Sequence, residues 1–181
     1  MIVMGVSGSG KSTFARLLAE RLGWDFEEGD ELHPAANVAK MASGQPLTDA
    51  DREPWLARIR AWIDSELDHD RSGVITCSAL KRRYRDELRR PGVRFVYLNV
   101  PRAELERRLV ERTDHFMPAS LLDSQLAALE PPEPDEDAIT VSAGDPEASV
   151  EEVVSATAGR GAPALRAGGD DHSASAGQPA A

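Results

Sequence analysis

One eight-residue segment restricts the possible folds more than any other feature of the sequence. Residues 5–12 read Gly-Val-Ser-Gly-Ser-Gly-Lys-Ser and satisfy the pattern G-x-x-x-x-G-K-[ST] at every fixed position. The apolar run Ile2 to Val6 leads into this segment, and apolar residues at 14, 17, 18 and 22 follow it at helical spacing. A strand, a glycine-rich turn and a helix in this order predict a phosphate-binding loop in an α/β domain.

The predicted loop carries the groups that bind the phosphates of a nucleotide. Its glycines let consecutive backbone N–H groups curl around a phosphate, and the helix that follows adds the positive end of its dipole. We expect Lys11 to reach the β- and γ-phosphates of a nucleoside triphosphate, and the Ser12 hydroxyl to ligate Mg²⁺. The expected nucleotide contacts are Gly5, Val6, Ser7, Gly8, Ser9, Gly10, Lys11, Ser12 and Thr13.

Other interpretations of the loop fit less well. A chance turn rich in Gly and Ser would not need the strand and helix that flank it. A dinucleotide fingerprint would need a small residue where Thr13 stands, and it has no role for Lys11 and Ser12. The loop alone does not separate a kinase from a GTPase switch or a motor ATPase, although the sequence lacks the N-K-x-D motif expected of a GTPase.

The rest of the sequence alternates between strand-length apolar runs and helical periods. Further strands are expected at 25–28, 74–77, 95–100 and 138–141, and helices at 54–68 and around 105–109, 121–129 and 150–154. This alternation predicts an α/β fold with a five-stranded parallel sheet covered by helices on both faces. From 159 to 181, 16 of 23 residues are Gly, Ala, Pro or Ser. We therefore expect a folded domain at 1–158 and a flexible tail at 159–181.

Net charge and apolar content exclude several classes of protein. Thirty-one acidic residues against 21 basic ones give a net charge of −10, which argues against a general binder of nucleic acid or of anionic membranes. No apolar run approaches the roughly 18 residues of a membrane span. No secretory signal is recognisable, and the single cysteine, Cys77, agrees with a reducing compartment. The expected location is therefore the cytoplasm.

Beyond the phosphate loop, three groups of residues resemble the gluconokinases, small P-loop kinases similar in fold to shikimate and adenylate kinases. The pattern GDxxHPxxNxxKMxxGxPLxDxDRxPWL at 29–56 resembles their substrate region, and CSALKxxYRDxLR at 77–89 resembles the segment after their third strand. HFM at 115–117, SQ at 124–125 and LEPP at 129–132 resemble their lid and the helix after it. The resemblance covers essentially the whole domain, although Asp114 stands where the family often has glycine.

The resemblance implies a P-loop kinase fold with helical substrate-binding and lid segments. It implies transfer of the γ-phosphate of ATP, with Mg²⁺, to the 6-hydroxyl of D-gluconate, and it suggests a homodimer. A kinase for another small anion such as shikimate is an alternative, and so is an NTPase without a small-molecule acceptor. Neither nucleic acid nor membrane is an expected partner.

The acceptor side needs a proton acceptor and cations. Asp30 is expected to position the acceptor hydroxyl and take its proton, unless it only caps a helix or closes a turn. Glu28 lies on the same strand face and would hold a water molecule of Mg²⁺, or be a solvated carboxylate. The candidates for the substrate carboxylate are Arg52, Lys81 and Arg85, with His33 as a further contact.

Several further arginines are candidates for binding phosphate. Arg112 adjoins the proposed lid and is expected to act on the phosphates, with His115 in the lid as a substrate contact. Arg107 and Arg108 are equally explained as exposed helical charges. Between 81 and 90, we interpret the remaining cations as a solvated helix face: Arg82, Arg83, Arg89 and Arg90.

Overall fold

The predicted five-stranded parallel sheet is present. The computed structural model describes residues 1–111 and 119–158, and its strands pair in the order β2-β3-β1-β4-β5, all in parallel. The strands are β1 (Ile2–Met4), β2 (Asp25–Glu27), β3 (Gly73–Thr76), β4 (Phe95–Asn99) and β5 (Ile139–Ser142). Each lies within two residues of its expected position at either end, which is the usual uncertainty of strand boundaries.

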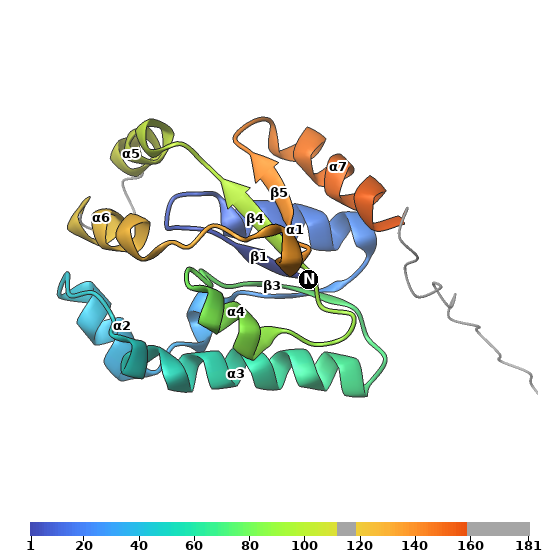
Figure 1. The fold of residues 1–181 in the computed structure, drawn as a ribbon, viewed down its shortest axis with the longest axis horizontal. Coiled ribbons are helices and arrows are strands. Elements are labelled where there is room, and N and C mark those ends of the chain that lie inside the picture. The colour runs from blue at the N-terminus through green and yellow to red at the C-terminus, as the bar shows by residue number, and fades with distance from the viewer. Residues whose placement is uncertain (112–118, 159–181) are drawn as a thin grey trace, which may run out of the picture.

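Helices cover both faces of the sheet, as expected for parallel strands (Figure 1). Because side chains alternate along a strand, Ile2 and Met4 pack against α3 (Asp49–Asp68) and α4 (Arg82–Leu88). Val3 between them packs against α1 (Lys11–Leu22) and α7 (Pro146–Ala158). Two apolar clusters, one on each face, therefore form the core.

A third, smaller apolar cluster lies at the carboxyl ends of the strands. It joins Val6 after β1, Leu80 after β3, Leu105 of α5 (Arg102–Glu111) and Leu122 of α6 (Ala119–Ala128). In Figure 1, α5, α6 and α2 (Ala35–Ala42) lie together on this side of the sheet. The remaining short elements are the 3₁₀ turns η1 (Gly29–Leu32) and η2 (Pro134–Glu136). The loops expected to carry function thus share one edge, where ligands bind in open α/β sheets.

Helix α3 begins five residues before the expected start at Pro54. Thr48 is its N-cap: the Thr48 hydroxyl accepts from the Asp51 backbone N–H, and the Asp51 side chain accepts from the Thr48 N–H. This reciprocal capping box starts the helix in a polar segment that carries no apolar period. Pro54 therefore lies inside the helix rather than in its first turn, which corrects the expectation.

Helix α7 is described as far as Ala158, and the domain boundary expected there stays a prediction. The expected tail at 159–181 and the central part of the expected lid lie outside the described residues. In the described parts of the chain, no helix combines the length and the apolar character that a bilayer span requires.

We predict that Thr48→Ala lowers the free energy of unfolding by about 1 kcal/mol, because the first turn of α3 loses its side-chain cap. Urea denaturation monitored by circular dichroism measures the change. Glu53→Ala, at an exposed position of the same helix, is the control and should change stability by much less. Equal effects of the two substitutions would contradict a capping role.

Candidate functional site

The phosphate loop has the backbone conformation that its glycines allow. Gly5, Gly8 and Gly10 have φ values of 147°, 80° and 92°, which residues with a Cβ atom rarely adopt. A Cβ atom on Gly5 would also lie 2.9 Å from Ser9 Oγ and 3.1 Å from the carbonyl oxygen of Leu98. The loop therefore folds back closely on itself between β1 and α1, as the motif predicts.

Two helices from much later in the sequence contact this loop. The Ser7 backbone N–H donates to Gln125 Oε1 of α6 at 2.7 Å, and Arg108 Nη1 of α5 donates to the Ser9 carbonyl oxygen at 3.3 Å. Within the loop, Lys11 Nζ donates to the Val6 carbonyl oxygen at 3.1 Å. Arg108 also bonds Glu104 one helical turn earlier, at 2.7 Å. Arg108 is thus fixed against the loop. From the sequence, it was equally explained as an exposed helical charge.

A cavity of about 290 Å³ opens beside the loop. Ser9, Gly10, Thr13 and Arg108 line one part of it, and the connection 142–146 between β5 and α7 lines another. A pocket with apolar walls and a few polar groups next to a phosphate loop can hold the nucleoside part of a nucleotide.

On the acceptor side, η1 places Asp30 next to a stacked pair of rings. His33 and Trp55 stack with ring centroids 4.3 Å apart, and Trp55 Nε1 donates to the Gly29 carbonyl oxygen at 2.7 Å. Burial lowers the pKa of His33, while the nearby Asp30 carboxylate raises it and the nearby Arg52 guanidinium lowers it. Asp30, His33 and Arg52 therefore lie in one electrostatic neighbourhood, as the sequence led us to expect.

Asp49 and Tyr84 are the centre of the acceptor-side charges, and the sequence did not single them out. Lys81 Nζ donates to both carboxylate oxygens of Asp49 at 2.9 and 3.1 Å, and the Tyr84 hydroxyl and Arg83 also bond Asp49. The bonds from Tyr84 and Lys81 hold the pKa of Asp49 well below its usual range. The Arg52 guanidinium carbon and Lys81 Nζ lie 5.8 and 5.9 Å from the centroid of the Tyr84 ring. This group combines cations with a hydrogen-bond acceptor, which suits a ligand with both an anionic group and hydroxyls.

Glu28 and Gly29 are held by the end of β3. The Thr76 hydroxyl donates to Glu28 and accepts from the Gly29 N–H at 2.9 Å. A Cβ atom on Gly29 would lie 1.8 Å from the Thr76 carbonyl oxygen, so only glycine fits there. Glu28 and the Ser12 hydroxyl both offer oxygen, the donor that Mg²⁺ prefers. The donor chemistry of these residues therefore fits the expected metal.

The buried thiol of Cys77 lies within electrostatic range of both halves of the site. Burial and, to a smaller extent, the Asp30 carboxylate raise its pKa to about 12, against a backbone hydrogen bond at Ala79 and the charge of Lys11, which lower it. Because Asp30 and Lys11 both act on this one thiol, the loop after β1 and the turn after β2 lie close to each other. Since the thiol stays protonated, Cys77 belongs to the wall of the site rather than to its reacting groups.

Comparison with known proteins agrees with this geometry. Residues 1–132 match the family model described as an AAA domain. The chain is 54% identical to the gluconokinase of Gluconobacter oxydans (strain 621H) over 157 residues, which cover 85% of this chain and 88% of that protein. The crystal structure of a gluconokinase from Sinorhizobium meliloti 1021 is 46% identical, with a TM-score of 0.79, and the match covers 87% of this chain and 90% of that one.

The chain belongs to the gluconokinase family. It is therefore a kinase of the P-loop class, as the resemblance implied. Shikimate kinase from Acinetobacter baumannii, at 19% identity and a TM-score of 0.61, shares the fold alone.

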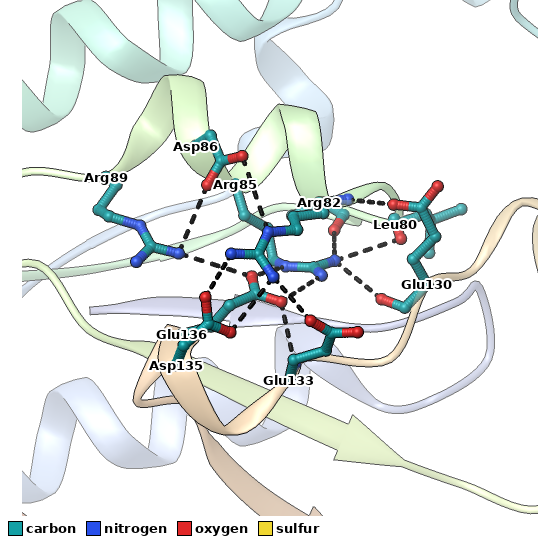
Figure 2. A network of polar contacts seen from close by, with 10 residues as sticks. Leu80, Arg82, Arg85, Asp86, Arg89, Glu130, Glu133, Asp135 and Glu136 are labelled. Carbon is teal, nitrogen blue, oxygen red and sulfur yellow. Dashed lines mark hydrogen bonds and ion pairs between the residues drawn. The ribbon is translucent and has the colours of Figure 1, made fainter.

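The structure corrects one assignment in this gluconokinase-family site. Arg85 was expected to bind substrate, but its side chain is only 1% exposed. Its guanidinium donates to both carboxylate oxygens of Glu136 at 2.5 and 2.8 Å and to three backbone carbonyls (Figure 2). The assignment of Arg85 to a substrate contact is therefore wrong, because burial leaves the guanidinium no access to a ligand.

The other arginines near α4 lie closer to the surface, as expected, but they are ion-paired. Arg82 Nη1 and Nη2 lie 2.8 and 2.5 Å from carboxylate oxygens of Glu133 and Asp135, and Arg89 lies 3.5 Å from Asp86. Figure 2 shows these charges around the buried pair. Surface pairs of this kind contribute little to stability.

The two lid assignments of the sequence stay predictions. Arg112 and His115 lie outside the described residues. Arg108 is the described arginine of this region that contacts the phosphate loop. The i,i+4 spacing of Glu104 and Arg108 was a sequence signal for a fixed rather than a solvated side chain.

We predict that Arg108→Gln weakens binding of a non-hydrolysable ATP analogue by about ten- to hundredfold, since the positive charge held beside the phosphate loop is lost. Isothermal titration calorimetry measures the dissociation constant. Arg107→Gln is the matched control, because Arg107 pairs with the same Glu104. If both variants lose affinity equally, the effect comes from α5 as a whole and not from the contact of Arg108.

Proposed function

We propose that this chain is an ATP-dependent gluconokinase that converts D-gluconate to 6-phospho-D-gluconate. The observation that carries the proposal is its 54% identity to a gluconokinase over most of both chains. The acceptor-side residues support it independently. Gluconate is a linear polyol that ends in a carboxylate, and cations lie beside a hydrogen-bond acceptor in the group of Arg52, Lys81, Tyr84 and Asp49.

In the proposed reaction, Asp30 orients the 6-hydroxyl of gluconate and accepts its proton. The hydroxyl oxygen forms a bond to the γ-phosphorus of ATP while the bond from that phosphorus to the β–γ bridging oxygen breaks, and ADP leaves. Lys81 and Arg52 hold the carboxylate at the other end of the polyol. Asp49 accepts hydrogen bonds from hydroxyl groups of gluconate. Fixing both ends of the substrate aligns the 6-hydroxyl with the phosphate.

On the nucleotide side, the phosphate loop holds the β- and γ-phosphates and Lys11 neutralises the charge that develops on them. Ser12 would ligate Mg²⁺, and Glu28 would hold it through water. When bound, Mg²⁺ neutralises charge on the β- and γ-phosphate oxygens. Arg108 and the lid residue Arg112 are proposed to act on the nucleotide from the other side. A homodimer in the cytoplasm is part of the same proposal, and sedimentation velocity tests the dimer.

We expect gluconate to give the largest stimulation of ADP release by the purified full chain. The measurement is a coupled ADP assay with gluconate, other sugar acids, shikimate and nucleoside monophosphates, with Mg²⁺ and ATP held constant. Faster turnover of shikimate or of a nucleoside monophosphate would overturn the substrate, while leaving a P-loop kinase.

Variants of the acceptor site should separate catalysis from binding. Asp30→Asn keeps the shape of the side chain but cannot accept the proton, so we expect kcat to fall by about 10²-fold or more. Lys81→Gln should instead raise KM for gluconate by about ten- to hundredfold and leave KM for ATP nearly unchanged. Steady-state kinetics with each substrate varied in turn measures both. A rise in KM for ATP with Lys81→Gln would place this cation at the nucleotide instead.

A further inference from the structure

The buried Arg85 guanidinium joins two segments of the chain that are far apart in sequence. Its Nη1 atom donates to the carbonyl oxygens of Ala79 at 3.1 Å and Leu80 at 3.3 Å, in the turn before α4. The same atom donates to the Glu130 carbonyl oxygen at 2.9 Å, in the segment after α6. Glu136, on η2, neutralises the guanidinium and has a side chain with no exposed surface. One cation thus ties the turn 77–81 to the segment 129–136.

This turn needs such support because of its backbone. Ala79 has a φ of 42°, a left-handed conformation that is unfavourable for a residue with a Cβ atom. The bonds of Arg85 to the Ala79 and Leu80 carbonyls favour this conformation over an extended one. Lys81 follows directly, so the direction of its side chain depends on the turn being held.

Glu130 fixes the backbone on both sides of Lys81. The Glu130 N–H donates to the Leu80 carbonyl oxygen at 2.8 Å, and Glu130 Oε2 accepts from the Arg82 N–H at 2.6 Å. The hydrogen bond from Arg85 to the Glu130 carbonyl therefore holds Glu130 in place. Glu130 in turn fixes the backbone of Leu80 and Arg82, the two neighbours of Lys81. Hydrogen bonds in such a buried network depend on one another.

The same segment is continuous with the helix that contacts the nucleotide side. Leu122 of α6 shares an apolar cluster with Leu80 and with Val6 of the phosphate loop, and Gln125 of α6 accepts from the Ser7 N–H. The turn that carries Lys81 is therefore packed against elements that also contact the phosphate loop.

We propose that Arg85 is a positioning residue, whose buried ion pair with Glu136 holds the turn 77–81 and so places Lys81 in the acceptor site. Arg85 touches no substrate and acts through Lys81. The proposal rests on the proposed function, because it takes gluconate as the acceptor that Lys81 binds. It accounts for a buried ion pair that stability alone does not require, since apolar replacements of such pairs are often as stable.

The first test is kinetic coupling between two residues. Glu136→Gln should raise KM for gluconate about tenfold and leave KM for ATP within about twofold, because the Glu136 carboxylate holds Arg85 with a bidentate bond. Its other contacts are with Arg89 and the Glu133 N–H. Lys81→Gln should then have a much smaller effect on KM for gluconate in the Glu136→Gln background than in the wild type. Asp135→Asn is the matched control, because it breaks the exposed pair with Arg82 on the same turn and should change neither KM. An unchanged KM for Glu136→Gln, or additive effects with Lys81→Gln, would overturn the proposal.

A second variant separates positioning from stability. Arg85→Met combined with Glu136→Leu removes the buried charges and the bonds to the carbonyls, and it should fold with a melting temperature near that of the wild type. We expect the same rise in KM for gluconate in this folded protein. A normal KM for the folded double variant would contradict a positioning role. Glu136→Gln serves as the folded variant if the double variant does not fold, and Arg85→Lys if neither folds, with the same outcomes.

Amide hydrogen exchange tests the turn without any substrate. In the folded variants, the Arg82 amide should exchange faster than in the wild type, while the amides of α3 should keep their protection. Unchanged exchange at Arg82 would overturn the positioning role, whatever acceptor the enzyme uses. Failure of gluconate in the substrate assay would overturn the proposed function instead, so the two failures are distinguishable.

Discussion

Parallel pairing of the five strands forces the connection after each strand to leave from the same edge of the sheet. Both faces are occupied by apolar helices, so the polar side chains that these connections carry gather at that edge. The phosphate loop after β1, Asp30 after β2 and Lys81 after β3 are neighbours for this reason. The order β2-β3-β1 places the loop next to the strand that leads to Lys81 and one strand away from Asp30.

A buried ion pair completes this edge. Charges are costly to bury, and a pair offsets the cost only when its hydrogen bonds are satisfied. Arg85 meets this condition with a bidentate bond to Glu136 and bonds to three carbonyls. The bidentate bond holds the pKa of the Glu136 carboxyl below its usual value. The proposed positioning role explains why these charges are buried despite the cost. A left-handed turn next to Lys81 needs directional contacts, which apolar packing does not supply.

The sequence predicted the sheet, its covered faces and the phosphate loop because each depends on local patterns. Helix α1 was predicted, since its apolar residues recur at helical spacing between glycines on both sides. The start of α3 was misplaced because residues 49–53 contain no apolar residue larger than Ala50, and the capping box at Thr48 outweighs the position of Pro54. Asp49 and Tyr84 were missed as partners of Lys81 because their meeting depends on how α3 packs against α4.

The sequence by itself predicted the phosphate loop and assigned Asp30, His33 and Arg52 to the acceptor side of the site. It could not decide between two cations, one just before α4 and one within it. Lys81 and Arg85 are four residues apart, and both were assigned to the substrate. Only the tertiary structure separated them, because Glu136, 51 residues further along the chain, docks over Arg85. Long-range packing decides which of the two cations is buried away from solvent. The local pattern of charges in the sequence carries no information about this burial.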